Sequence, residues 1–201
     1  MKIPRKASDI LVKNYLKYVD YIKTKPEKDT DIIKNTVMLF YDLNIDDFNS
    51  FKYSTILDMY KIIDNIMKIP QELVNIIEID GIEYGINPDF DDMTFAEMVD
   101  CDTEDVLQQM CVLYRPIEKK KGTKYTIKKY EADIEIYNKL KETLTLDIYL
   151  GFIGFFLKIN RDILNFTLNS LTEMDMDPEK RKILEKSGLG LAGYMNSVMV
   201  I

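Results

Sequence analysis

The sequence predicts a mainly α-helical protein: a bundle of about six to eight helices with one small β-hairpin insertion. Apolar residues recur at helical spacing through most of the chain, whereas a short segment around residues 76–86 alternates with a period of two. At 201 residues and 46% hydrophobic, the chain can bury a core without disulfides or metals. We therefore expect a single domain over residues 1–201, with the hairpin as a subordinate element.

The N-terminal part, residues 1–70, predicts three amphipathic helices. Ser8 or Asp9 can cap the first helix, which ends before a proline. The second helix is expected over residues 29–42. The third is expected over residues 52–69, where apolar and charged side chains separate onto two faces and a following proline stops the helix.

The middle part, residues 71–116, has a different pattern. Isoleucine and tyrosine residues alternate on both sides of Asp80-Gly81, a strong hairpin signal. A two-stranded hairpin is marginal alone, so it must lie on the helices or on a partner's sheet edge. Thr94 and Glu97 predict a capping box that opens a short helix, and a second short helix follows.

The C-terminal part, residues 117–201, is expected to begin with a polar, mobile loop over residues 117–124. Helix resumes near Lys129. The apolar run 148–157, which continues to Leu171, is hydrophobic on all sides and predicts the central helix against which others pack. A last short helix and an apolar, glycine-punctuated tail follow.

The composition argues against most enzyme classes. The chain has no histidine, which removes the commonest general base, the Ser-His and Cys-His nucleophile systems and nearly all catalytic zinc sites. Cys101 and Cys111 lack the spacing of metal ligands and are expected to be inert core thiols in a reducing compartment. We expect no catalytic residue, metal or cofactor. A hydrolase that uses only carboxylates is the one enzyme type left open.

The acidic turn of Asp89, Asp91 and Asp92 invites comparison with a calcium loop. Counted from Asp89, position six is Thr94 instead of glycine and position twelve is Asp100 instead of glutamate, so the EF-hand pattern fails. We expect a solvated turn.

The charge of the chain, −7 with a pI near 4.8, disfavours nucleic acid as a partner. One group of lysines lies close together in the sequence. We expect these lysines to lie in a solvated loop, and a contact with an acidic partner or with packaged nucleic acid is the alternative. It consists of Lys119, Lys120, Lys121, Lys124, Lys128 and Lys129. The longest apolar run is half of what a bilayer requires, so no membrane contact is expected.

Contacts with other proteins are expected at the hairpin, at the Tyr114-Arg115-Pro116 corner and in the apolar tail. Arg115 can satisfy the carbonyls of a helix end or pair with the acidic turn. The tail is either a frayed end or a segment laid into a groove or sheet edge of a partner. The candidate partner-binding residues are Tyr84, Tyr114, Arg115, Pro116, Tyr194, Met195 and Val198.

The middle segment also carries a resemblance over about residues 76–171. The matching motifs are Gly81-x-x-Tyr84, Pro88-Asp89, Met93-Thr94-Phe95-Ala96-Glu97, Leu113-Tyr114-Arg115-Pro116 and Tyr125-x-Ile127-x-x-Tyr130. This pattern resembles small head and tail proteins of tailed bacteriophages, especially crAss-like phages, and is similar to tail assembly chaperones. The chain departs from a minimal chaperone in its three N-terminal helices and its apolar tail.

The resemblance implies a non-enzymatic virion or tail-assembly protein that acts through protein–protein contacts with capsid, portal or tail components. It places the protein in the virion or the host cytoplasm, and a homo-oligomer stays open as an alternative. The competing hypothesis is a small cytoplasmic regulator or inhibitor that binds a host protein.

Overall fold

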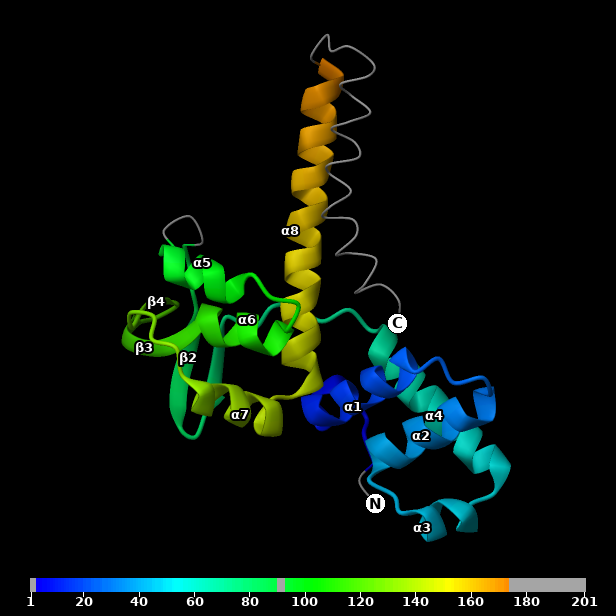
Figure 1. Cartoon of the computed structure of the whole chain (residues 1–201). Helices are drawn as coiled ribbons and strands as arrows, with labels where there is room; N and C mark the ends of the chain where they lie inside the picture. Colours follow the sequence, from blue (N-terminus) through cyan, green and yellow to red (C-terminus); the bar gives the residue numbers. More distant parts are fainter. Residues whose placement is uncertain (1–2, 90–92, 174–201) are drawn as a thin grey trace. The chain divides into compact units, whose positions relative to one another are not determined.

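The computed structural model describes residues 3–89 and 93–173, and within them the chain forms eight α-helices and four strands (Figure 1). The mainly helical class is confirmed. The prediction of one small hairpin is wrong, because the strands form a four-stranded antiparallel sheet. The chain divides into two compact units, Met1–Phe152 and Ile153–Ile201.

The N-terminal helices largely follow the sequence prediction. They are the short 3-10 turn η1 (Ala7–Asp9), α1 (Val12–Lys23), α2 (Asp29–Tyr41), α3 (Ile45–Ser50) and α4 (Tyr53–Lys68). The first helix begins later than expected because Asp9 belongs to η1, where its carboxylate accepts the backbone N–H groups of Arg5 and Lys6. The sequence prediction missed α3, whose N-cap Asn44 accepts the N–H of Asp47 at 2.8 Å.

Aromatic contacts hold these helices together. The rings of Tyr18 on α1 and Phe40 on α2 lie 5.7 Å apart. The Tyr41 hydroxyl donates to the carbonyl of Met59 on α4, at 3.2 Å, and Ile63 of α4 is fully buried. The hydroxyl of the buried Tyr41 thus has a hydrogen-bond partner while its ring fills the core.

A short backbone link joins the N-terminal helices to the far end of the first unit. The Val12 N–H donates to the Leu144 carbonyl at 2.8 Å, and the Leu146 N–H donates to the Ile10 carbonyl at 2.9 Å. Beside this link, the ring of Tyr15 meets that of Tyr149 edge-on, with centroids 5.9 Å apart.

The sheet consists of two consecutive hairpins. Its strands are β1 (Ile76–Ile79), β2 (Ile82–Ile86), β3 (Tyr114–Lys121) and β4 (Lys124–Ile127), in the order β1-β2-β3-β4. The first hairpin matches the prediction, and Asp80 and Gly81 both take positive φ at its turn. The second hairpin replaces the mobile loop expected over residues 117–124, and Gly122 turns it with φ 62°.

Tyr125 fastens the second hairpin to the first. Its ring covers Gly85 of β2 so closely that a Cβ at Gly85 would overlap it. Its hydroxyl donates to the carbonyls of Ile86, at 2.8 Å, and Asn75, at 3.3 Å. A strand glycine here marks the close approach of another side chain.

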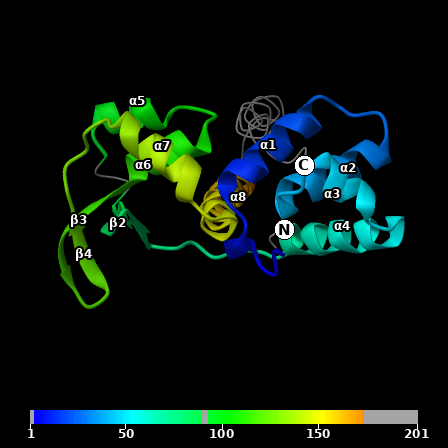
Figure 2. The ribbon, with the colours of Figure 1, turned by 90° about the horizontal axis from the view of Figure 1, so that it is seen from below.

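Three helices gather beside the sheet (Figures 1 and 2). They are α5 (Phe95–Cys101), α6 (Val106–Leu113) and α7 (Ile134–Thr143). The expected start of α7 near Lys129 is wrong, because residues up to Ile127 are used by β4 and Asp133 caps the helix by accepting the Glu135 N–H at 2.8 Å.

Helix α8 (Leu146–Glu173) begins in the first unit. There Tyr149 and Phe152 are buried, and Gly151 lies against the Glu72 carbonyl with no room for a Cβ.

In the second unit, residues 153–159 of the helix are half-buried or exposed. The rings of Phe155 and Phe156 meet edge-on at 5.3 Å, whereas Gly154 is exposed. Within the apolar run 148–157, only Tyr149, Gly151 and Phe152 are buried, so the expectation of burial on all sides is wrong for this run. No helix in residues 3–89 and 93–173 is both long and apolar enough to cross a membrane. The expected last helix and tail lie outside the described residues.

Candidate functional site

Helix α5 is amphipathic in the reverse of the usual sense. Its buried residue is Glu97, which is 2% exposed. Phe95, Met98 and Val99 are 83%, 61% and 54% exposed. Their i, i+3, i+4 spacing places them together on one side of the helix, which we name the α5 apolar face. Large apolar side chains grouped in this way mark a contact surface more often than scattered ones do.

Glu97 faces inward because two sets of contacts hold its carboxylate. The Thr94 N–H donates to Glu97 Oε2 at 2.6 Å, and Thr94 Oγ1 accepts the Glu97 N–H at 3.3 Å, which confirms the predicted capping box. Arg115 Nη1 of β3 lies 2.7 Å from Glu97 Oε1, and both side chains are largely buried. The helix is therefore joined to the sheet by an ion pair.

The electrostatics of the pair favour the charged carboxylate. Burial alone would raise the pKa of Glu97, but the hydrogen bonds from Thr94 and the charge of Arg115 outweigh it and hold the pKa below its ordinary value. Arg115 Nε is buried without a hydrogen-bond partner among the described residues.

Two tyrosines reinforce the position of α5 and α6. The Tyr130 hydroxyl donates to the carboxylate of Asp100 on α5, at 2.6 Å. The Tyr137 hydroxyl of α7 donates to Asp105 at 2.7 Å, and Asp105 also accepts the Leu107 N–H at the start of α6. Because its inner contacts are polar and directional, α5 is fixed with its apolar face outward.

Four of the predicted partner-binding residues lie in strands β2 and β3, and one of them, Arg115, forms an ion pair with α5. Tyr84 and Tyr114 are buried, and the Tyr114 hydroxyl donates to the Val74 carbonyl at 2.6 Å. Pro116 pairs with Tyr84 across β2 and β3, and Arg115 holds Glu97. The other three, in the tail, lie outside the described residues: Tyr194, Met195 and Val198.

Sequence reasoning found the helix but missed its orientation. A spacing of i, i+3, i+4 at Phe95, Met98 and Val99 fits an inward face as well as an outward one. The capping box carried the useful signal, because it ties the side chain of Glu97 to one side of a very short helix.

The acidic turn and the two cysteines are the other candidate sites of the sequence. Asp89 donates its N–H to Asn87 Oδ1 at 3.1 Å, and Asp91 and Asp92 lie outside the described residues. No group of three or more metal-ligating side chains occurs in the part of the chain that the structure describes. Burial raises the pKa of the Cys101 thiol to about 11 and that of Cys111 to about 12, helped by nearby carboxylates, so both are protonated at neutral pH.

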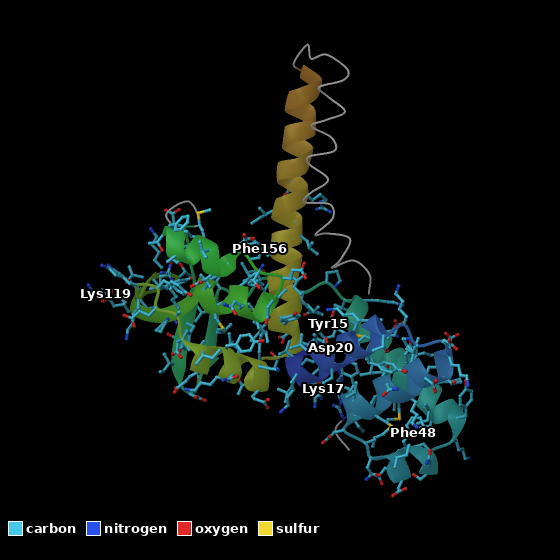
Figure 3. The ribbon with its side chains drawn as sticks, in the orientation of Figure 1. Tyr15, Lys17, Asp20, Phe48, Lys119 and Phe156 are labelled. Carbon is cyan, nitrogen blue, oxygen red and sulfur yellow. The ribbon has the colours of Figure 1, made fainter. Side chains whose placement is uncertain are left out.

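A cleft of about 380 Å³ opens among the N-terminal helices. Phe48, Phe51 and Tyr53 supply its apolar wall, and Asp31 and Lys34 also line it. Phe48 belongs to α3 (Figure 3). A cleft with this lining suits an apolar side chain.

Charge is strongly separated around the sheet. Residues 69–114 contain twelve acidic residues and no lysine or arginine, whereas residues 115–129 contain seven basic residues and one acidic residue. Within the sheet, one contact bridges the two regions, between Lys120 Nζ and Glu83 Oε1 at 2.6 Å.

Comparison of the chain with protein families, with curated proteins and with solved structures finds no match.

Proposed function

We propose that the protein is non-enzymatic and works by binding other proteins through the α5 apolar face. The observation that carries the proposal is the reversed amphipathicity of α5. Fully burying a side chain such as Phe, Met or Val stabilises by roughly 1.5–3 kcal/mol each, and α5 leaves Phe95, Met98 and Val99 outside while it buries Glu97. A partner that covers this face removes the three side chains from water, which favours binding.

The class of partner follows from the resemblance of the middle segment to small proteins of tailed bacteriophages. The motif residues Thr94, Glu97, Arg115 and Tyr130 are also those that hold α5 in place. Capsid, portal or tail components are therefore the proposed partners, and the protein is a virion or tail-assembly component in the virion or host cytoplasm.

The test compares two variants of the full chain with the wild type. Phe95→Ser/Met98→Ser removes the α5 apolar face, and the matched control Ile134→Ser removes an apolar side chain that is 73% exposed elsewhere. The free energy of unfolding of each variant is expected to lie within about 0.5 kcal/mol of the wild-type value, because neither variant changes the core. Only Phe95→Ser/Met98→Ser should fail to capture the structural proteins that are encoded beside this protein.

Equal capture by Phe95→Ser/Met98→Ser and the wild type would contradict the role of α5. Absence of the wild-type protein from both virions and assembly intermediates, measured by mass spectrometry, would contradict the phage structural role.

A second candidate is a small cytoplasmic regulator or inhibitor that binds a host protein. The cleft lined by Phe48, Phe51 and Tyr53 favours it, because an inserted apolar side chain is a common anchor in such complexes. This function predicts production early in infection and capture of a host protein that Phe48→Ala abolishes and Phe95→Ser/Met98→Ser leaves intact.

A further inference from the structure

The β3–β4 hairpin carries an unfavourable arrangement of charge. Lys121 of β3 lies directly opposite Lys124 of β4, and Lys119 lies two residues earlier on β3, opposite Thr126. Directly paired residues point to the same side of a sheet, so the three lysines share one side of the hairpin, which we name the lysine face. All three are exposed, and Lys119 projects from the outer part of the sheet (Figure 3).

Like charges directly opposite each other destabilise a strand pair. Lys120 on the other side of β3 is neutralised by Glu83. The described residues provide no ion pair for Lys119, Lys121 or Lys124. The lysine face is therefore a concentration of positive charge that an acidic partner would stabilise.

The α5 apolar face has the complementary chemistry. Asp102, the C-cap residue of α5, follows Val99 by three residues and so continues the same side of the helix. Asp102 and Glu104 are both exposed. This acidic end lies in the region without lysine or arginine, residues 69–114.

A lysine side chain matches both halves of this surface. Its methylene stem can cover Met98 and Val99 while its ammonium group reaches Asp102 or Glu104. The ring of Phe95 offers a further cation site on its face. A docked lysine would thus contact both the exposed apolar side chains of α5 and the exposed carboxylates at its end.

We propose that the lysine face of one copy docks on the α5 apolar face of a second copy, so that copies join head to tail. This inference rests on the proposed function and names the partner at the same site. Because each contact uses one surface of each copy and leaves the other surface free, it can be repeated into a ring or an open chain of copies. Every copy carries both surfaces, whereas a nucleic acid would meet the repulsion of the acidic region as well.

The test uses charge reversal in the full chain. Lys119→Glu/Lys121→Glu reverses the lysine face, and Asp102→Lys/Glu104→Lys reverses the acidic end of α5. Lys52→Glu/Lys61→Glu is the control for the net charge of the lysine-face variant, which it matches. In sedimentation velocity at about 0.05 M salt, the wild type and the control should associate as concentration rises. Each of the other two variants alone should associate at least about tenfold more weakly, because its two surfaces repel each other.

Mixing the two reversed variants gives the decisive result. The acidic hairpin of one fits the basic α5 end of the other, so the mixture should associate again, in alternation. Raising the salt to about 0.5 M should weaken every association, because the screening length falls to about 4 Å.

Three results would overturn the inference: a wild type that stays monomeric at every concentration, a lysine-face variant that associates like the wild type, or association that requires added nucleic acid. The proposed function can survive these results. If Phe95→Ser/Met98→Ser loses a phage partner while the lysine-face variant keeps it, α5 binds another protein and only the head-to-tail contact is refuted.

Discussion

The Glu97–Arg115 pair sets the orientation of α5 from within. Replacing a buried ion pair by well-packed apolar residues is often neutral or stabilising, so its presence is weak support for a stabilising role. Its geometric effect is clearer. An apolar residue at position 97 would allow the helix to turn Phe95 and Met98 toward the sheet, whereas a carboxylate bound to Thr94 and Arg115 does not.

The first prediction concerns Glu97→Gln. The folded-state pKa of Glu97 lies below its ordinary value, so the carboxylate contributes stability above that ordinary value and loses it as the pH falls through the lowered pKa. At neutral pH the variant leaves Arg115 buried without its counter-charge and should lose about 2–4 kcal/mol in the free energy of unfolding.

Urea unfolding at a series of pH values measures this difference. The gap between the wild type and Glu97→Gln should shrink as the pH falls below the ordinary glutamate pKa. Glu97→Gln/Arg115→Met should recover part of the loss at neutral pH, because no charge is then left unpaired. A gap that is the same at every pH would show that the carboxylate is not ionised in the fold.

Helices and strands with a regular hydrophobic period were predictable from the sequence, whereas a hairpin whose exposed positions are filled by lysines was not. Helices α2 and α4 and the β1–β2 hairpin follow their hydrophobic periods and turn residues closely. The β3–β4 hairpin was missed because lysines occupy its exposed positions, which hides the alternation of Ile117, Tyr125 and Ile127. Lys124 lies on the edge strand β4, where a lysine also protects against unwanted pairing, so a polar segment can still be a strand.

In the candidate site, too, one feature was predictable from the sequence and two were not. The capping box at Thr94 and Glu97 was readable because it depends on four consecutive residues. The pairing of Glu97 with Arg115 depends on how α5 meets β3, and the outward direction of Phe95 depends on that pairing. Neither can be inferred from local spacing.

The second prediction tests the link between the hairpins. Gly85→Ala places a Cβ against the Tyr125 ring, which must move and strain its hydrogen bonds to Ile86 and Asn75. We expect a loss of about 1–3 kcal/mol in the free energy of unfolding. In a Tyr125→Leu background the same glycine change should cost at least about 1 kcal/mol less, because the two residues are coupled.

A double-mutant cycle by thermal or urea unfolding measures this coupling. Strictly additive losses for Gly85→Ala and Tyr125→Leu would mean that Tyr125 does not cover β2 in the folded protein.

On the scale of the whole molecule, the boundary between the two units falls within one continuous helix. The first turns of α8 belong to the core of the first unit through Leu146, Tyr149 and Phe152. Beyond the boundary, Lys158 and Arg161 are exposed. A helix with this gradient of burial is expected to open from its less buried portion while its first turns stay folded.

Hydrogen exchange provides the third prediction. Peptides covering residues 147–152 should exchange at least about tenfold more slowly than those covering residues 157–162, because exchange in the former requires opening of the core. Gly151→Ala, which forces the Glu72 carbonyl away, should accelerate exchange in the first group and leave the second group unchanged. Identical rates in both groups of the wild type would indicate that α8 opens as one piece with the core.

The hydrogen bonds that link Ile10 and Val12 to Leu144 and Leu146 also have a consequence for synthesis on the ribosome. The segment that leads into α1 is synthesised before its backbone partners, which appear only after most of the first unit has been translated. Until then the N–H of Val12 and the carbonyl of Ile10 lack these partners, and closing so long a loop carries an entropic cost that slows folding. The first unit therefore completes its fold late, and a nascent chain halted before residue 144 lacks this closing contact.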